Sequence, residues 1–146
     1  MKILFDTNII LDVLLDRKPF VDIAAKLLSL VEKKEIDGFL GATTITTIFY
    51  LAAKVTDKNR AKTAVGKLLS LFEIAPITQL VLKEAINLQF VDFEDAVLHE
   101  AARQVEVQGI VTRNPKDFNK ASISIYTPDE LYKMLVSIKP VISRTL

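Results

Sequence analysis

Short apolar segments of strand length alternate with longer segments of helical periodicity along the chain. Strands are expected at residues 2–6, 37–42, 72–77, 109–113 and 122–127. Between them, apolar residues recur every three or four positions, which is typical of amphipathic helices. Because this alternation favours parallel strands with helices on both faces, we expect an α/β fold, a three-layer α/β/α sandwich around a mostly parallel five-stranded sheet.

The expected helices begin and end at recognisable signals. They span about 9–15, 21–34, 43–55, 58–71, 79–90, 92–107 and 127–138. Asn8 is the expected N-cap of the first helix, Thr78 caps the fifth, and Pro128 opens the last at a position that proline favours. No repeat or linker interrupts the 146 residues, so we expect a single domain over 1–146.

The composition excludes several classes of protein. The chain has no cysteine, which excludes disulfides and thiolate metal sites and makes the reducing cytoplasm the expected compartment. No apolar run approaches the roughly 18–20 residues of a membrane span, so we expect no membrane association. Nineteen basic and eighteen acidic residues give a net charge of +1, which identifies no partner by itself.

The first expected strand ends in polar residues within apolar surroundings. Asp6, Thr7 and Asn8 stand between two apolar triplets, and Asp12 follows one helical turn later. An isolated buried carboxylate is costly unless it is paired or bound to a cation. Sites in open parallel sheets form just outside the carboxyl ends of the strands. We therefore expect Asp6 at the rim of a cleft and not in the core.

Two further acids are expected at the same edge of the sheet. Asp95 lies near the start of the helix at 92–107, and Asp117 lies in the turn after the fourth strand. Asp92, three residues before Asp95, shares its helix face and is a supporting candidate. Acids that meet at one edge repel one another unless a cation balances them. Mg²⁺ or Mn²⁺ prefers such oxygen ligands, and it activates water and neutralises charge on a phosphate.

Three stretches occur in an order and at separations that resemble the PIN-domain family. They are ILFDTNIILDVLLDR at 3–17, DFEDAVLHEAA at 92–102 and GIVTRNPKDF at 109–118. The resemblance extends to about Thr127. It implies a Mg²⁺- or Mn²⁺-dependent endoribonuclease, similar to the toxins of prokaryotic toxin–antitoxin pairs. An RNA substrate and a small antitoxin protein are the partners that follow from it.

The resemblance also assigns roles to individual residues. Asp6 and Asp95 fall on metal-binding positions of the family. The segment TRNPKDF supplies the last polar group of the catalytic set through Asn114 or Asp117. Supporting polar positions match three further residues: Thr7, Asn8 and Thr112.

This chain departs from the family in the helix at 43–55. The family usually has a glutamate in a stretch resembling TITEIYYL, whereas this chain reads TITTIFYL and has Thr47 at the matching position. A hydroxyl is a weak, neutral substitute for a carboxylate, so weaker metal binding is expected. The alternative to an active ribonuclease is therefore a PIN domain that binds RNA or protein without cutting. Phosphoryl transfer with Asp6 as nucleophile is a third hypothesis, but no second acid follows two residues later.

Basic residues gather where the helices at 43–55 and 58–71 meet, opposed only by Asp57. Such a cluster is either an ordinary solvated helix face or a contact for a phosphate backbone, where Lys and Arg supply most of the affinity. In an RNA-binding protein the second reading applies, and Arg113 at the end of the fourth strand joins the set. The expected RNA-binding residues are Lys54, Lys58, Arg60, Lys62 and Arg113.

The single histidine, His99, lies one helical turn after Asp95. An imidazole titrates near neutrality and can act as a general base. Histidines on helix faces are more often structural, so a structural role is expected.

The segment 43–71 also predicts self-association. Its helices have apolar faces, and Asp57 is its one acid. Exposed apolar patches of several hundred Å² usually mark an interface. Toxin-type PIN domains, which this chain resembles, are dimers, so a homodimer is expected.

Overall fold

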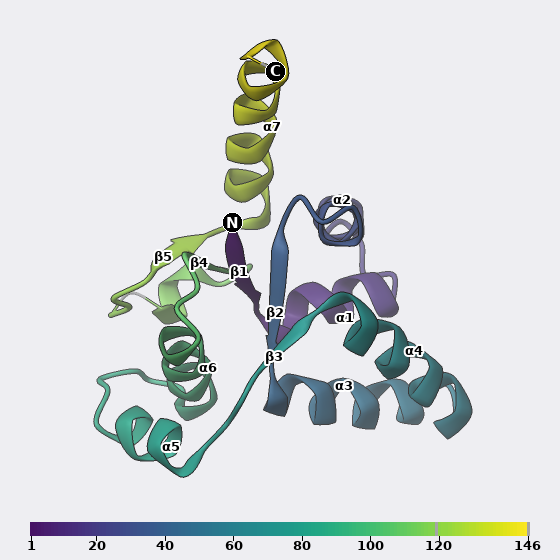
Figure 1. Ribbon diagram of the computed structural model, residues 1–146. Helices are drawn as coiled ribbons and strands as arrows, with labels where there is room; N and C mark the ends of the chain where they lie inside the picture. The colour runs from purple at the N-terminus through teal and green to yellow at the C-terminus, as the bar shows by residue number, and fades with distance from the viewer. Residues whose placement is uncertain (119, 146) are drawn as a thin grey trace.

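The computed structural model describes residues 1–118 and 120–145, so the expected domain end at Leu146 lies outside the described residues. Within this part of the chain, five strands form one sheet in the order β3-β2-β1-β4-β5 (Figure 1). The strands are β1 (Lys2–Phe5), β2 (Asp37–Gly41), β3 (Glu73–Ala75), β4 (Gly109–Val111) and β5 (Ser124–Tyr126). Every neighbouring pair is parallel. The expected α/β fold with a central five-stranded sheet is confirmed.

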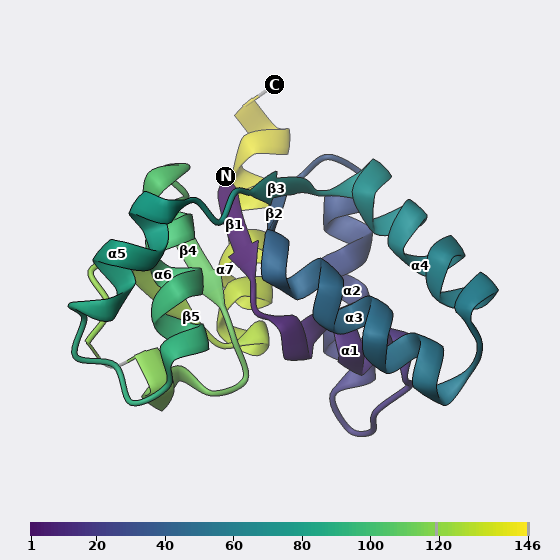
Figure 2. The same cartoon turned by 90° about the horizontal axis from the view of Figure 1, so that it is seen from below.

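Helices cover both faces of this sheet. One face packs against α1 (Thr7–Leu14), α2 (Val21–Glu32), α3 (Ala42–Val55), α4 (Lys58–Leu71) and α7 (Pro128–Thr145). The other face packs against α5 (Gln79–Ile86) and α6 (Phe93–Gln104), and a 3₁₀ turn, η1 (Pro115–Phe118), follows β4. Figure 2 shows α5 and α6 on one side of β1 and β2, and α1, α3 and α4 on the other. None of the described helices is both long and apolar enough to cross a membrane.

The central strand β1 is apolar throughout because it is buried on both faces. Successive side chains of a strand point to opposite sides. Ile3 and Phe5 belong to the core beneath α1 and α2, whereas Leu4 belongs to the core beneath α6. All three side chains are fully buried. A continuous apolar run is the pattern expected of a strand inside a parallel sheet.

Several helix boundaries differ from expectation. Asp6 and not Asn8 is the N-cap of α1, since the Asp6 carboxylate accepts a hydrogen bond from the Thr7 backbone N–H at 2.8 Å. The prediction for Asn8 was wrong because the strand ends one residue earlier than expected and the helix starts at once. Three helices are shorter than predicted, with α2 ending at Glu32, α5 at Ile86 and α6 at Gln104, whereas α7 extends to Thr145.

Asp12, the second acid of the opening segment, is completely buried and finds its partner near the other end of the chain. The Arg113 guanidinium donates from Nε to Asp12 Oδ2 at 2.7 Å and from Nη2 to Oδ1 at 3.2 Å. Arg17 approaches the same carboxylate at 3.8 Å, and Arg113 stacks 3.9 Å from the centre of the Phe20 ring. Arg113 thus fastens the end of β4 to α1, and its expected role in RNA binding stays a prediction.

Replacing Arg113 by methionine is expected to destabilise the fold by ~3 kcal/mol, because it leaves the buried Asp12 charge without its main partner. Removing both charges in the double variant Asp12→Leu/Arg113→Met should recover much of that loss. Urea unfolding measures the free energy of unfolding of the wild type, the single variant and the double variant. The control is Arg60→Met, which removes an exposed arginine 3.7 Å from Asp57 and should cost less than about 1 kcal/mol. Equal losses for the two single variants would contradict a structural role for the buried pair.

Candidate functional site

A polar cleft of about 270 Å³ opens at the carboxyl edge of the sheet, where β1 and β4 end. Its walls come from α1, α3, α6, η1 and the residues just before α6 and η1. Acids dominate its lining, and they are Asp6, Asp92, Glu94, Asp95 and Asp117. Neutral polar residues also line it, namely Thr7, Asn8, Thr47 and Asn114, and the rest of the lining is apolar, from Leu11, Leu51 and Leu98. The structure thus brings together acids that are up to 111 positions apart in the sequence, Asp6 and Asp117 being the farthest.

Asp6 is the most deeply embedded acid that lines the cleft, with only 6% of its surface exposed. One carboxylate oxygen accepts from the Thr7 N–H and the other from the Thr112 hydroxyl, both at 2.8 Å. The Thr112 hydroxyl accepts in turn from the Asn114 N–H at 3.0 Å. Burial raises the pKa of Asp6 above its ordinary value, although the hydrogen bonds from Thr112 and Thr7 act in the opposite direction. Asp6 is therefore both more buried than the sequence predicted and rigidly held.

The wall formed by α3 carries no charge. Thr7 links α1 to this helix through a 2.8 Å hydrogen bond between its hydroxyl and that of the buried Thr44. Thr47, three residues further along α3, lines the cleft. No residue of α3 is acidic, so every carboxylate in the cleft comes from another part of the fold.

Asp95 experiences the strongest repulsion from its neighbours. It lies in the first turn of α6, where its backbone N–H donates to the Asp92 carboxylate at 3.1 Å. Burial raises the pKa of Asp95 to about 7, with further contributions from the charges of Asp6, Asp92, Asp117 and Glu94. Burial and the neighbouring negative charges both disfavour the ionised form of this carboxyl group. A cation in the cleft would offset those neighbouring charges.

The donor set fits a hydrated divalent ion better than a closed metal cage. Among residues 1–118 and 120–145, no three histidine, aspartate or glutamate side chains already stand close enough together to enclose an ion. Mg²⁺ keeps several water ligands and needs only one or two carboxylates. The cleft offers carboxylate, hydroxyl and amide oxygens, which suit Mg²⁺ or Mn²⁺.

One acid of the cleft was missed, and several other candidate residues lie outside the cleft in keeping with the other roles expected of them. Glu94 lines the cleft, and its place in the first turn of α6, where acids are favoured, was the available signal. His99 is buried and is not part of the lining. The basic residues of α3 and α4 do not line the cleft either, and these are Lys54, Lys58, Arg60 and Lys62.

Replacing Asp95 by asparagine is expected to raise the melting temperature of the metal-free protein at pH 8 and to change it little near pH 4. The folded pKa of about 7 lies above the ordinary 3.8, so the folded state binds this proton more tightly than the unfolded state. The contribution of Asp95 to the free energy of unfolding of the wild type therefore falls as the pH rises from about 4 to about 7. Asparagine stays neutral, so its advantage grows over that window and then levels off.

Thermal melts in EDTA between pH 4 and pH 8 measure this difference. The control is Glu32→Gln, which removes an exposed acid at the end of α2, outside the cleft. An advantage of Asp95→Asn that stays constant across the pH range would show that crowding of carboxylates is not its cause.

Comparison with known proteins agrees with the geometry. Residues 2–116 match the PIN domain family. Ribonuclease VapC1 of Aquifex aeolicus (strain VF5) is 25% identical to this chain over 134 residues, which cover 88% of this chain and 92% of the relative.

Solved structures share the fold as well. A toxin–antitoxin complex from Klebsiella pneumoniae contains a chain of 26% identity with a TM-score of 0.67, covering 86% of this chain and 96% of that one. DNA-bound VapBC from Salmonella typhimurium has a TM-score of 0.69 at 18% identity, covering 88% of this chain and 98% of the other. Since the family match extends over most of its length and includes four of the five acids that line the cleft, with Asp117 directly beyond its end, this chain belongs to the PIN domain family.

Proposed function

We propose that this protein is a toxin-type endoribonuclease that uses Mg²⁺ or Mn²⁺ to hydrolyse RNA phosphodiesters in the cytoplasm. The observation that carries this proposal is the crowding of carboxylates around a rigidly held Asp6, in a cleft open to solvent. The similarity to Ribonuclease VapC1 supports RNA as the substrate class. Water and phosphate oxygens both have room in a cleft of about 270 Å³.

In this proposal, Asp6, Asp95 and Asp117 would hold a hydrated metal ion together with its water ligands, since Mg²⁺ needs only one or two direct carboxylate ligands. When bound, the ion lowers the pKa of a water ligand and neutralises charge that develops on the phosphate. Each carboxylate oxygen has two lone pairs, so the oxygens of Asp6 can accept from Thr7 and Thr112 and still face a cation. The Asn114 amide can donate to a phosphate oxygen.

Two neighbours of the acids keep this set in place. Asp92 caps α6 and fixes the first turn on which Asp95 lies. Asn8 accepts from Arg17 at 3.5 Å, which orients its amide beside the cleft that it lines. These side chains support the metal-binding acids by fixing the backbone that carries them.

Cleavage of a single-stranded RNA over a Mn²⁺ titration tests the proposal. Wild type should cleave, and Asp6→Asn should abolish cleavage while the metal-free protein stays folded. Thr47→Glu should increase Mn²⁺ affinity, because an anion a few ångströms from a divalent cation is worth kcal/mol even at an effective dielectric of about 20. It should also lower the metal-free melting temperature, since it adds a like charge beside Asp6 and Asp95.

The matched control for Thr47→Glu is Thr46→Glu, which places the same charge on the exposed side of α3. Equal effects of the two substitutions would show that general charge and not the cleft is responsible. If wild type and Thr47→Glu are both inactive in every metal but bind RNA, the weakened, non-cleaving PIN domain replaces the enzyme.

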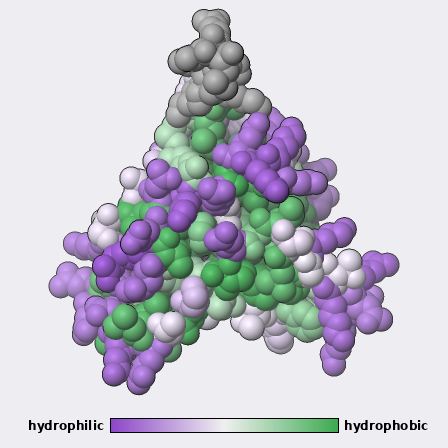
Figure 3. Space-filling view, in the orientation of Figure 1, coloured by the Kyte–Doolittle hydropathy of each residue, from purple (hydrophilic) through white to green (hydrophobic). Residues whose placement is uncertain are grey.

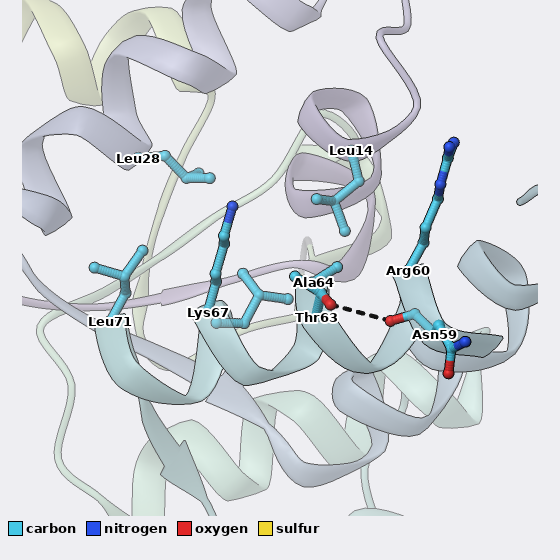
Figure 4. Close-up of a pocket in the computed structure, with 9 residues that line it drawn as sticks. Leu14, Leu28, Asn59, Arg60, Thr63, Ala64, Lys67 and Leu71 are labelled. Atoms are coloured by element: carbon cyan, nitrogen blue, oxygen red, sulfur yellow. Dashed lines mark hydrogen bonds between the residues drawn. The ribbon is translucent and has the colours of Figure 1, made fainter. Parts of the chain in front are cut away.

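We also propose an antitoxin protein as partner and place it in an apolar groove between α1, α2 and α4. The groove has a volume of about 460 Å³, and its apolar lining includes Leu14, Leu28, Leu68 and Leu71. Figure 4 shows Leu14 and Leu28 facing the side chains of α4, with Arg60 and Lys67 extending along the opening. Figure 3 shows apolar surface in the middle of the face that is seen in the orientation of Figure 1, with hydrophilic side chains around it. The similar solved structures are toxin–antitoxin complexes, so an apolar antitoxin segment with acidic neighbours is the proposed occupant.

A second copy of the chain is the other proposed partner. Apolar side chains stay exposed on α3 and on α5 with the loop that follows it, away from the groove lining. The most exposed of them are Tyr50, Val55, Ile86 and Val91. Of these four residues, only Tyr50 and Val55 lie in the segment 43–71, from which a dimer was expected.

Leu71→Glu is expected to weaken binding of the proposed antitoxin partner by at least about tenfold, because it places a charge in the groove at a cost above 1.4 kcal/mol. The control is Leu69→Glu on the same helix, an exposed leucine outside the groove lining. Calorimetry measures affinity, and light scattering of the same samples gives the number of copies. Equal weakening by both substitutions would remove the groove as the binding site.

A further inference from the structure

His99 connects α6 to the segment that follows η1. Its Nε2 accepts from the Ser122 backbone N–H at 3.1 Å, and the Ser122 hydroxyl lies 3.3 Å from the same nitrogen. Its Nδ1 lies 3.3 Å from a carboxylate oxygen of Glu100. A backbone N–H is donated only to an unprotonated ring nitrogen, so Nδ1 carries the hydrogen and donates it to Glu100. The imidazole is therefore neutral, with its acceptor directed at Ser122.

The surroundings of His99 maintain this neutral form. Burial lowers the pKa of His99, and the hydrogen bond with Glu100 opposes that shift only in part. Arg103 neutralises the same carboxylate through hydrogen bonds of 3.0 Å from Nε and 2.8 Å from Nη2. Because Glu100 already has a cationic partner, it does not require a charged imidazole.

His99 also belongs to an aromatic cluster beneath the cleft. The Phe90 ring lies 5.2 Å from the imidazole and 5.9 Å from the Phe118 ring, measured between ring centres. Phe118 directly follows Asp117, and Phe90 precedes Asp92 by two residues. The imidazole thus packs against Phe90, which in turn contacts Phe118, yet it does not itself line the cleft.

We propose that His99 is a positioning residue that holds the segment of Asp117 against α6, and so sets the separation of Asp117 and Asp95. This role rests on the proposed metal-binding function of the cleft. The hydrogen bond from the Ser122 N–H fixes the chain that follows η1, and the buried side chain of Phe118 anchors η1 itself in the core. Outer-shell contacts of this kind typically change metal affinity 10–100-fold when they are lost.

Two substitutions separate the hydrogen bond from the packing. His99→Leu fills the space but provides no acceptor, whereas the side-chain oxygen of His99→Gln can again accept a hydrogen bond from the Ser122 N–H. We expect His99→Leu to bind Mn²⁺ about tenfold more weakly in calorimetry and to show a smaller Mn²⁺-induced rise in melting temperature. His99→Gln should restore both towards wild type. Leu27→Ala, a buried change in α2 outside the cleft lining, controls for lost stability and should leave Mn²⁺ affinity unchanged.

Hydrogen exchange at the Ser122 amide tests the same claim without metal. The amide should be protected in wild type and His99→Gln and should exchange faster in His99→Leu. If His99→Leu does not fold, Ser122→Pro removes the donor from an exposed residue and should weaken Mn²⁺ binding likewise. Unchanged Mn²⁺ affinity in His99→Leu, or an unprotected Ser122 amide in wild type, overturns the positioning role. A wild type without any response to Mn²⁺ overturns the proposed function instead, and amide exchange then decides the positioning.

Discussion

The parallel pairing of β1 with β4 is the contact on which the cleft depends. Phe5 pairs with Val111 at the end of both strands, and the Asp6 N–H donates to the Val111 carbonyl at 3.0 Å. The next residues, Asp6 and Thr112, are consequently neighbours, and their side chains form a 2.8 Å hydrogen bond. The backbone of the sheet, and not a flexible side chain, therefore fixes the position of the central carboxylate. Rigid support from secondary structure is what a metal or catalytic site requires.

The same segment shows two different solutions for a buried carboxylate. Asp12 is neutralised by the protein itself, because Arg113 and Arg17 approach it from two sides. Asp6 accepts hydrogen bonds only from neutral donors, and although the Arg113 charge lowers its pKa, the charged residues that line the cleft with it are all acids. The cost of burying a charge without a counter-charge is large. Asp12 thus stabilises the fold through its ion pairs, whereas the negative charge of Asp6 is available to attract a cation from solution.

Much of the fold and part of the site could be predicted from local pattern. Asp6 after an apolar strand, Asp95 at a helix start and Asp117 after the fourth strand line one cleft because parallel strands present their carboxyl ends at one edge. The pattern was less informative about boundaries, where capping competes among neighbours, as Asp6 and Asn8 show. It was least informative about Arg113, whose local sequence does not reveal that its partner lies 101 positions earlier.

Local sequence patterns were enough to predict the alternation of strands and helices, and with it the parallel sheet and the edge at which the acids gather. Those features follow from short-range periodicity and from general rules of connection. The three-dimensional fold was needed to show which charges are paired, that Glu94 joins the cleft, and that the acceptor of His99 is directed at Ser122. These outcomes depend on burial and on distances between segments far apart in the chain. A side chain's role is set by the atoms within a few ångströms of it, and in this fold many of those atoms come from distant positions.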